Sequence, residues 1–369
     1  MKILTIVGAR PQFIKAYPVS KAISEHKNVE EILLHTGQHY DFNMSKIFFS
    51  ELSLKEPDYN LGVGSGSHGE QTGEMLKGIE DVITKESPNL ILIYGDTNST
   101  LAAALAGAKS QIPVAHIEAG LRSYNLKMPE EINRILADRI STYLFCPTET
   151  AVNNLMKEGF EKFNYEGFKF KKPKIVFSGD VMYDAFLLCN KILKSSLQIQ
   201  KLIEECEEFH LATIHRAENT DIKSNLKNII GALDKISKDI PVIFPIHPRT
   251  KEKLKNYNIA PEKLKLIEPV GYFDMLYLLN NCKAVFTDSG GLQKEAYFSK
   301  KPCITLRAET EWTELVQIGA NRLVGADDTL ITRAAQEINK THLKIKTGIY
   351  GNGNASKEII DLLVKDLMQ

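Results

Sequence analysis

The chain has 369 residues, with 46 Lys and Arg against 46 Asp and Glu, so its formal net charge at pH 7 is zero. This length exceeds what one hydrophobic core usually organises, and we expect two domains of about 150 to 200 residues each. The balanced charge argues against a nucleic-acid or membrane-surface partner held by bulk electrostatics. The five cysteines contain no Cys-x-x-Cys pair, which predicts free thiols and neither a zinc site nor a disulfide framework.

Short apolar runs alternate with segments of helical period in the first part of the chain. The runs KILTIVG, EILLHTG, LILIYGD and PVAHIEAG are separated by a helix from about Phe13 to Glu25 and by further helical segments, among them LAAALAGAKS. This alternation predicts a parallel sheet with helical crossovers, covered on both faces. The first run is too short for a signal peptide and no apolar segment approaches 18 residues, so we expect a cytoplasmic protein without a membrane partner.

A Lys-rich, aromatic stretch from Lys157 to Lys174 interrupts the pattern, and a second series follows. That series contains KIVFSGD, FHLATIH, a helix near Leu226 to Ser237, PVIFPIHP, KLKLIEP, KAVFTDSGG, KPCITLR and NRLVG. We therefore predict an α/β protein with two Rossmann-like, doubly wound parallel-sheet domains, residues 1–170 and 171–352, facing a cleft.

Ionisable side chains follow many of the apolar runs. Ligands of open parallel sheets bind outside the carboxyl ends of the strands, where loops converge. The residues at these ends are Arg10, His35, Asp96, Glu118, His215, His247, Asp288 and Arg307.

Three carboxylates stand out in the first domain. Glu118 lies near the end of the apolar run PVAHIEAG, where a buried, unpaired carboxylate would cost roughly several kcal/mol. Asp96 has the same place in GDTNST, and capping of the next helix by Thr97 or Ser99 would leave it free for chemistry. Glu130 opens a helix, where the helix dipole alone would favour it. Carboxylates that share a cleft can have their proton affinities pushed apart, so that one acts as base and another as acid.

Two patterns point toward a cofactor, and both are weak. His116 and Glu118 lie two apart on a strand and so face the same way, as metal ligands could, but no third ligand is evident. The run Gly64 to Gly69 matches G-x-G-x-x-G, yet no strand precedes it. We expect no metal and no nicotinamide cofactor, and interpret this run as a mobile loop that faces the active site.

The second domain carries an anion-binding pattern in DSGGLQKEA. After Ser289, the backbone N–H groups of Gly290 and Gly291 open a helix, which suits a diphosphate. Glu295, one to two turns further on, can accept a ribose diol.

Basic residues at other loop ends strengthen this prediction. In HRAEN, His215 with Arg216 fits an anion-binding turn, and the charge of His215 can assist a departing phosphate. Arg10, Lys15 and Arg307 are further candidate phosphate contacts. A nucleotide diphosphate is therefore the predicted ligand.

An ordered set of motifs carries a family resemblance. VGARPQFIK, HTGQH, GDTNSTLAAALA, PVAHIEAGLRS, MPEEINR, CPTE, HRAEN, PIHP, DSGGLQKEA, KKPCITLR and TEWTE, from Met1 to about Gly325, resemble the UDP-N-acetylglucosamine 2-epimerase family. The resemblance implies the B-type glycosyltransferase fold, with a C-terminal helix in residues 353–369 that crosses back to the N-terminal domain. It also implies a UDP-sugar substrate, no cofactor and a homodimer.

The implied reaction is non-hydrolysing epimerisation at C2. A base removes the C2 proton, UDP leaves C1, and the resulting 2-acetamidoglucal takes UDP back after protonation on its other face. The roles carried over are acid–base catalysis for Asp96, Glu118 and Glu130; assistance to the leaving group for His215; nucleotide-sugar binding for Arg10 and Lys15; phosphate binding for Ser289, Gly290 and Gly291; and ribose binding for Glu295.

Two departures from the common family pattern concern the substrate and its regulation. Common members have Thr-Glu-Arg-Pro where this chain has Thr310-Glu311-Trp312-Thr313, so a phosphate would depend more on Arg307. This motif and the short loop before Pro129 are more similar to the branch that acts on UDP-2,3-diacetamido-2,3-dideoxyglucuronic acid. Tyr40 and Asp41 follow HTGQH in place of the usual Arg, which argues against the family's regulatory UDP-N-acetylglucosamine site.

Other hypotheses remain open at this stage. A hydrolysing relative would release UDP and free N-acetylmannosamine. A glycosyltransferase of the same fold would need an acceptor, and an idle nucleotide-sugar-binding module would bind UDP without solvent exchange.

Overall fold

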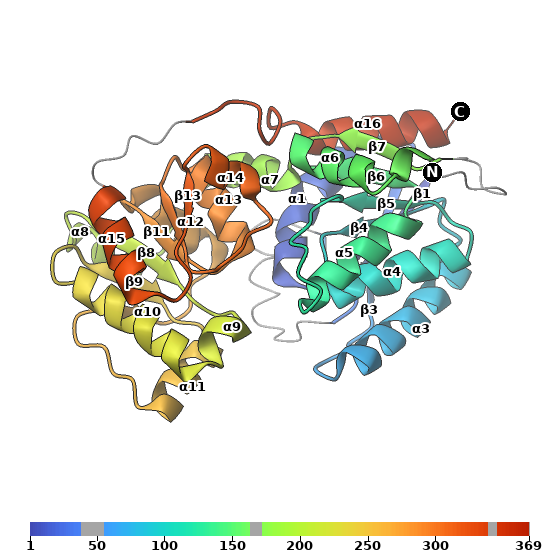
Figure 1. The fold of residues 1–369 in the computed structure, drawn as a ribbon. Coiled ribbons are helices and arrows are strands. Elements are labelled where there is room, and N and C mark those ends of the chain that lie inside the picture. Colours follow the sequence, from blue (N-terminus) through green and yellow to red (C-terminus); the bar gives the residue numbers. More distant parts are fainter. Residues whose placement is uncertain (38–54, 163–171, 339–344, 369) are drawn as a thin grey trace. The chain divides into compact units, whose positions relative to one another are not determined.

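The computed structural model describes residues 1–37, 55–162, 172–338 and 345–368. The chain divides into two compact units, the first formed by Met1–Leu188 with Thr347–Gln369 and the second by Cys189–Lys346 (Figure 1). The strands of the first unit are β1 (Lys2–Val7), β2 (Glu30–His35), β3 (Tyr59–Asn60), β4 (Leu90–Tyr94), β5 (Val114–Ile117), β6 (Tyr143–Cys146) and β7 (Lys174–Phe177). Its helices are α1 (Arg10–Ser24), α3 (His68–Glu86), α4 (Asn98–Lys109), α5 (Pro129–Ile140), α6 (Glu149–Lys157), a 3-10 turn (Phe160–Lys162) and α16 (Ala355–Leu367), and α7 (Val181–Lys191) leads into the second unit.

The first unit is a seven-stranded parallel sheet in the order β3-β2-β1-β4-β5-β6-β7. Helices α3, α4 and α5 cover one face, where their apolar side chains pack on those of β1, β2 and β4. The strand order reverses between β1 and β4, and at such a switch point the loops after the two strands diverge, which is where open parallel sheets bind ligands.

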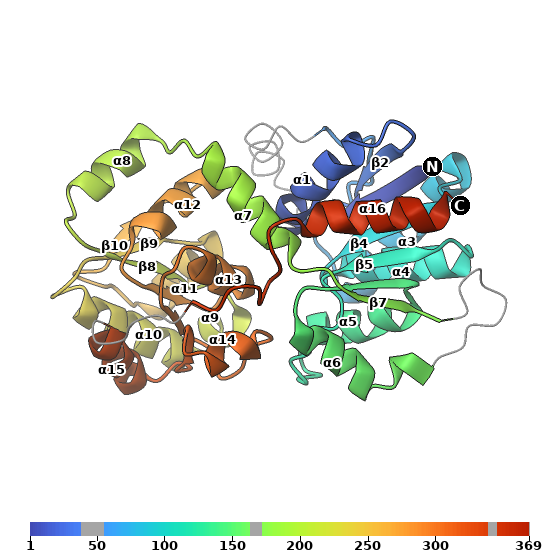
Figure 2. The ribbon, with the colours of Figure 1, turned by 90° about the horizontal axis from the view of Figure 1, so that it is seen from above.

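Helix α16 returns to the first unit, where it packs against α1 (Figure 2). At its start, the backbone N–H groups of Ala355 and Ser356 donate to the Asp184 carboxylate at 3.2 and 2.7 Å. Near its end, Lys174 of β7 pairs with Asp366 at 2.7 Å.

Strand β7 is the element that differs from the sequence-based division. We predicted that KIVFSGD opens the second domain, but β7 pairs with β6 in the first sheet, with Ile175 opposite Leu144. The first unit consequently runs to Leu188 instead of ending at residue 170. A short apolar run shows that a strand exists, but its partner strand is a long-range choice that the run itself does not encode.

The second unit is a six-stranded parallel sheet in the order β10-β9-β8-β11-β12-β13. The strands are β8 (His210–Thr213), β9 (Val242–Pro245), β10 (Lys265–Ile267), β11 (Val285–Thr287), β12 (Cys303–Thr305) and β13 (Asn321–Leu323). The helices are α8 (Leu197–Glu204), α9 (Ala217–Thr220), α10 (Lys223–Ile236), α11 (Pro248–Tyr257), α12 (Tyr272–Asn281), α13 (Gly290–Phe298), α14 (Thr313–Gln317) and α15 (Asp328–Ile338).

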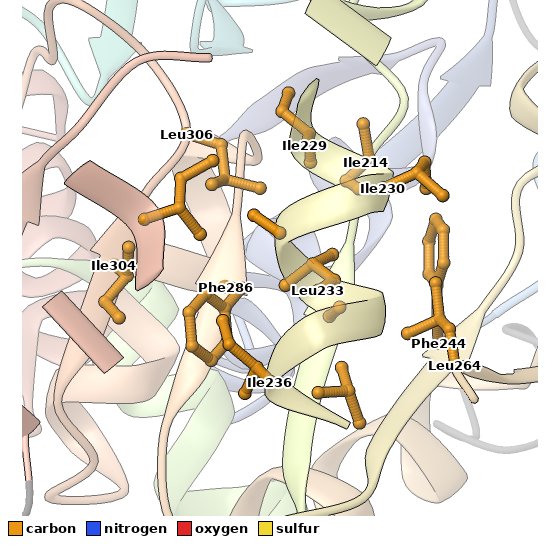
Figure 3. Packing of buried hydrophobic residues seen from close by; sticks show 14 of the residues in the cluster. Ile214, Ile229, Ile230, Leu233, Ile236, Phe244, Leu264, Phe286, Ile304 and Leu306 are labelled. Carbon is orange, nitrogen blue, oxygen red and sulfur yellow. The ribbon is translucent and has the colours of Figure 1, made fainter. Parts of the chain in front are cut away.

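The core of the second unit lies between α10 and the sheet (Figure 3). Ile229, Ile230 and Leu233 point from α10 toward Phe244 and Phe286, and all five side chains are buried. Their spacing on α10 matches one helix face. The strand order reverses between β8 and β11, which gives this unit a switch point of its own.

The predicted fold class, two Rossmann-like doubly wound units, is confirmed. Within the described ranges, none of the helices is long and apolar enough to span a membrane.

Candidate active site

Gln12 of α1 links the loops that follow β1 and β4. The strand order of the first sheet reverses between these two strands, and we call this place the switch point of the first unit. The Gln12 side-chain oxygen accepts from the backbone N–H groups of Gly8 and Ala9 at 2.8 and 3.0 Å, and its amide donates to the Tyr94 carbonyl at 2.8 Å. A Cβ at Gly8 would lie 2.1 Å from the Ser99 hydroxyl, so only glycine fits there. Through Gln12, the motif VGARPQFIK therefore holds together the carboxyl ends of β1 and β4, and Asp96 follows the second of these strands.

Asp96 follows β4 and is held by Arg134 of α5. The Arg134 Nε and Nη2 groups donate to Asp96 Oδ2 at 3.0 and 2.7 Å, and the Asp96 side chain stays 30% exposed. Thr97 caps α4 by accepting from the Thr100 N–H, as the sequence predicts. Asp96 is thus released from capping, but it is ion-paired and not free.

Glu118 follows β5 and forms an ion pair with Lys15 of α1. Both residues are buried, at 8% exposure each. The backbone of Glu118 is left-handed, with φ of +71°, which costs a non-glycine residue about 1–2 kcal/mol. Lys15, predicted to hold the nucleotide sugar, therefore neutralises the carboxylate whose burial the sequence left unexplained.

Asp96 and Glu118 lie on the same stretch of the carboxyl edge of the sheet. A Cβ placed on Gly95, the residue before Asp96, would be 3.2 Å from Glu118 Oε2 and 3.2 Å from Lys15 Nζ. The two carboxylates have different cationic partners, one guanidinium and one ammonium.

The two glutamates at the start of α5 have different surroundings. Glu131 is fully buried and accepts from the backbone N–H groups of Ser123 and Tyr124 and from Arg134 Nη1. Glu130 is half-buried, and within the described ranges it makes no hydrogen bond or ion pair. Because Glu130 and Arg134 are four residues apart, they lie on the same side of the helix.

The G-x-G-x-x-G run leads into α3, which is capped by Ser67. The Asn98 amide lies 3.1 Å from Nδ1 of His68, and the Asn133 amide donates to the Asp96 carbonyl at 2.9 Å and to Asn98 Oδ1 at 3.3 Å. Two asparagines therefore link the end of this run to Asp96.

His116 and Glu118 do not share a site. His116 is fully buried and bonded to Asp138 and to the Gly95 carbonyl, whereas Glu118 has left the strand in a left-handed turn. In the part of the chain that the structure describes, no group of three His, Cys, Asp or Glu side chains is arranged to hold a metal ion.

Asp288 organises the switch point of the second unit. Its fully buried carboxylate accepts from the backbone N–H of His215 and of Arg216 at 3.1 and 3.0 Å, and from the Asn219 amide at 3.1 Å. The turn of HRAEN is therefore built around a carboxylate that follows the neighbouring strand. The His215 ring remains 40% exposed, with its centroid 5.8 Å from that of His247.

Ser289 caps α13, and Gly290 and Gly291 form its first turn. A Cβ on Gly290 would lie 3.9 Å from Arg216 Nη2 and 3.8 Å from Trp312 Nε1. Two N–H-bearing side chains thus lie beside the helix N-terminus, together with the Glu311 carboxylate, whose Oε2 would be 3.9 Å from the same Cβ.

Three further residues named in the sequence analysis contact other side chains of this unit. Glu295 accepts from the Tyr272 hydroxyl at 2.9 Å. Arg307 is buried and donates to both oxygens of Glu311, at 3.0 and 3.2 Å, so its charge is already balanced by a carboxylate. Trp312 lies under the ammonium of Lys294, 4.0 Å from the ring centroid.

Two predictions fall outside what the structure describes. Arg10 begins α1, but its side chain is not among those described. Tyr40 and Asp41, on which the argument about the regulatory site depends, belong to the undescribed range 38–54.

Comparison with known proteins identifies the family. The family model for UDP-N-acetylglucosamine 2-epimerase matches residues 21–364. The chain belongs to the UDP-N-acetylglucosamine 2-epimerase family. At this level it is a UDP-sugar 2-epimerase, and the family predicted from the motifs is confirmed.

Three relatives of this epimerase cover nearly its whole length. It is 53% identical to a UDP-N-acetylglucosamine 2-epimerase homolog of Methanococcus maripaludis, over 98% of this chain and 99% of the relative. It is 51% identical to the UDP-2,3-diacetamido-2,3-dideoxy-D-glucuronate 2-epimerase of Pseudomonas aeruginosa, over 99% of this chain and all of the relative. The crystal structure of Methanocaldococcus jannaschii UDP-GlcNAc 2-epimerase in complex with UDP-GlcNAc and UDP is similar with a TM-score of 0.90 at 44% identity, covering 99% of this chain and all of that one.

Several residues of the site escaped sequence reasoning. Arg134 is part of MPEEINR and lies one turn after Glu130, a spacing that could have identified it as a partner of the site. The sequence indicates Asp288 only as a residue at a loop end. The role of Gln12 depends on contacts with a strand 82 positions away and has no local signal.

Proposed function

We propose that this epimerase interconverts UDP-N-acetylglucosamine and UDP-N-acetylmannosamine without net hydrolysis, by elimination and re-addition of UDP through a 2-acetamidoglucal. The observation that carries the proposal is the pair Asp96 and Glu118 at one sheet edge, each held by a different cation. Inversion at C2 needs a proton to leave one face and return to the other, so it needs more than one acid–base group.

The proposed division of roles follows the two units. Asp96, Glu118 and half-buried Glu130 of the first unit serve as acid–base carboxylates. In the second unit, Ser289, Gly290 and Gly291 bind the diphosphate, the two glycines through their backbone N–H groups, and Arg216 adds positive charge. His215, with its ring exposed beside this helix start, assists the departing phosphate.

Exchange with solvent at C2 tests the reaction. Incubation of the protein with UDP-N-acetylglucosamine in deuterated water should place deuterium at C2 of both epimers, as observed by NMR. Retention of protium in the product epimer would contradict the proposal. Free UDP that accumulates in proportion to turnover would favour the hydrolysing alternative.

A second candidate substrate is UDP-2,3-diacetamido-2,3-dideoxyglucuronic acid. It is favoured by the similarity to the Pseudomonas aeruginosa protein and by Trp312, which lies beside Gly290 where common family members have arginine. The two substrates are compared by the rate of C2 exchange at matched concentrations. A higher kcat/KM for the uronic acid would change the substrate and leave the chemistry as proposed.

We also propose that the chain forms a homodimer. Helix α5 has polar residues on its buried face and exposes Ile132 and Leu136, and in the loop before it Tyr124 and Leu126 are also exposed. Light scattering should give about twice the chain mass of 41.4 kDa. A monomer at micromolar concentration would contradict the proposal.

A further inference from the structure

Asp138 of α5 is a fully buried carboxylate that touches neither Asp96 nor Glu118, yet it contacts the chain on both sides of Glu118. Its Oδ1 lies 2.7 Å from His116 Nδ1, two residues before Glu118. Its Oδ2 accepts from the Gly120 N–H at 3.1 Å and from Arg122 Nη1 at 2.7 Å. One side chain thus bonds to residues 116, 120 and 122.

His116 extends this contact to the neighbouring strand. Its Nε2 lies 2.7 Å from the Gly95 carbonyl, which can only accept, so Nε2 carries a hydrogen. Its Nδ1 faces the Asp138 carboxylate at 2.7 Å, so the ring bridges Asp138 and the turn after β4. Burial alone would raise the pKa of Asp138, but the hydrogen bond and charge of His116, together with Arg122, outweigh it and hold this pKa below its ordinary value.

The segment held in this way is strained. Glu118 has a φ of +71°, and its N–H and that of Ala119 converge on one acceptor, the Phe145 carbonyl, at 3.1 and 3.0 Å. A left-handed residue that is not glycine persists only where its surroundings fix it. Gly120, also at positive φ, is packed so closely that a Cβ would lie 2.5 Å from the Ala151 carbonyl.

We propose that Asp138 is a positioning residue for the C2 proton transfer. By binding His116 and Gly120 on either side of Glu118, it fixes the direction of the Glu118 carboxylate. Through His116 and the Gly95 carbonyl, it also fixes the turn that carries Asp96. The inference rests on the proposed function, because it assigns Asp138 to the orientation of the two carboxylates that move the proton.

The variant Asp138→Asn tests this role. An amide has one acceptor oxygen where the carboxylate has two, so the contact with His116 Nδ1 must change or the Gly120 and Arg122 donors must lose their acceptor. We expect kcat for C2 exchange to fall by about 10- to 100-fold, with KM changed by less than about threefold. Asp138→Glu keeps the charge but moves it by one methylene, and it should not restore kcat.

Asp184→Asn is the matched control. Asp184 is a buried carboxylate of the same unit that accepts from two backbone N–H groups, at the start of α16. Its variant should lose comparable thermal stability and keep kcat within about twofold, because it orients no carboxylate of the edge.

The outcomes separate the inference from the function on which it rests. A kcat for Asp138→Asn within about twofold of the parent, or an equal loss of kcat in Asp184→Asn at equal melting temperature, would overturn the positioning role. Recovery of kcat in Asp138→Glu would also overturn it, because charge and not geometry would then matter. A parent chain that exchanges no C2 hydrogen with either UDP-sugar refutes the proposed function itself.

Discussion

The two units use the carboxylates that follow their strands in different ways. In the first unit, Asp96 and Glu118 follow adjacent strands and each is paired with one cation. In the second unit, Asp288 also follows a strand at the switch point, but its oxygens accept from backbone N–H groups and an asparagine amide, and His215 Nδ1 lies 3.4 Å from Oδ1.

This difference distinguishes carboxylates that can act in acid–base catalysis from those that hold a turn in place. A carboxylate balanced by a single Lys or Arg can exchange that partner or a proton when a substrate arrives, which suits acid–base work. A carboxylate that accepts from several backbone N–H groups has no such freedom, and instead fixes a turn whose other groups face outward. The following predictions test this contrast.

Glu118→Gln should have the largest effect. Glutamine is isosteric and can still accept from Lys15, so the fold is retained while the base is lost. We expect C2 exchange to slow by about 10²- to 10⁴-fold, with UDP affinity unchanged within about threefold. NMR exchange rates and titration calorimetry measure the two quantities. Exchange that persists within about tenfold of the parent would place the base elsewhere.

Asp288→Asn should lower stability and UDP affinity, the two properties that Glu118→Gln is expected to retain. Its amide group would face the N–H donors of His215 and Arg216, and we expect a loss of about 3 kcal/mol in the free energy of unfolding of the second unit. UDP affinity should fall by about tenfold or more, because the turn beside α13 loses its anchor. Urea unfolding followed by the fluorescence of Trp312, the single tryptophan, reports this unit specifically. Unchanged UDP affinity at lowered stability would remove the proposed link between turn and diphosphate.

Mild acid should destabilise the second unit through His210 of β8. Burial, with a smaller contribution from the charge of Lys283, lowers the pKa of His210 from 6.5 to about 4. The unfolded chain therefore binds the proton first, and the stability contributed by neutral His210 is complete above about pH 6.5 and is lost as the pH falls toward 4. Between pH 7 and pH 5 we expect a loss of about 2 kcal/mol that is absent in His210→Leu.

Asp138 of the first unit should not contribute to this acid loss. Its pKa lies below the ordinary value, so its stabilisation persists until the pH falls below about 4. Trp312 fluorescence at the two pH values measures the second unit, and an equal loss in the parent and in His210→Leu would assign the acid sensitivity to another group.

Gln111→Gly should have the smallest effect, and it should raise the free energy of unfolding where Asp288→Asn lowers it. Gln111 is exposed and has a φ of +58°, similar to that of Glu118. Glycine adopts this conformation without strain, so we expect stability to rise by about 0.5–1 kcal/mol, with kcat unchanged. Thermal unfolding and C2 exchange check the two parts. A fall in stability would show that the left-handed backbone at this position carries no cost.

The sequence predicted the elements of the fold and the loop ends that carry the site. Apolar runs bounded by glycine identified β4, β5 and β11, and Asp-Thr at the end of LILIYG identified the Thr97 cap. The order of the motifs identified the family. Position after a strand is a local property, so Asp96, Glu118 and Ser289 could be singled out without a structure.

The pairing of charges could not be predicted in this way. Lys15 neutralises Glu118 across 103 positions of sequence, and Arg307, predicted to contact phosphate, donates to Glu311. Strand β7 joins the first sheet although it follows the predicted boundary. Each of these depends on which distant group fills the space beside a side chain, and no local pattern encodes that choice.

The sequence by itself determined which residues stand at the carboxyl ends of the strands, because hydrophobic periodicity and turn residues act over a few positions. Only the tertiary structure decided which of the carboxylates pair with a single Lys or Arg and which accept hydrogen bonds from backbone N–H groups. Burial makes an unpaired charge costly, so each buried carboxylate takes a partner that the packing of distant elements brings to it.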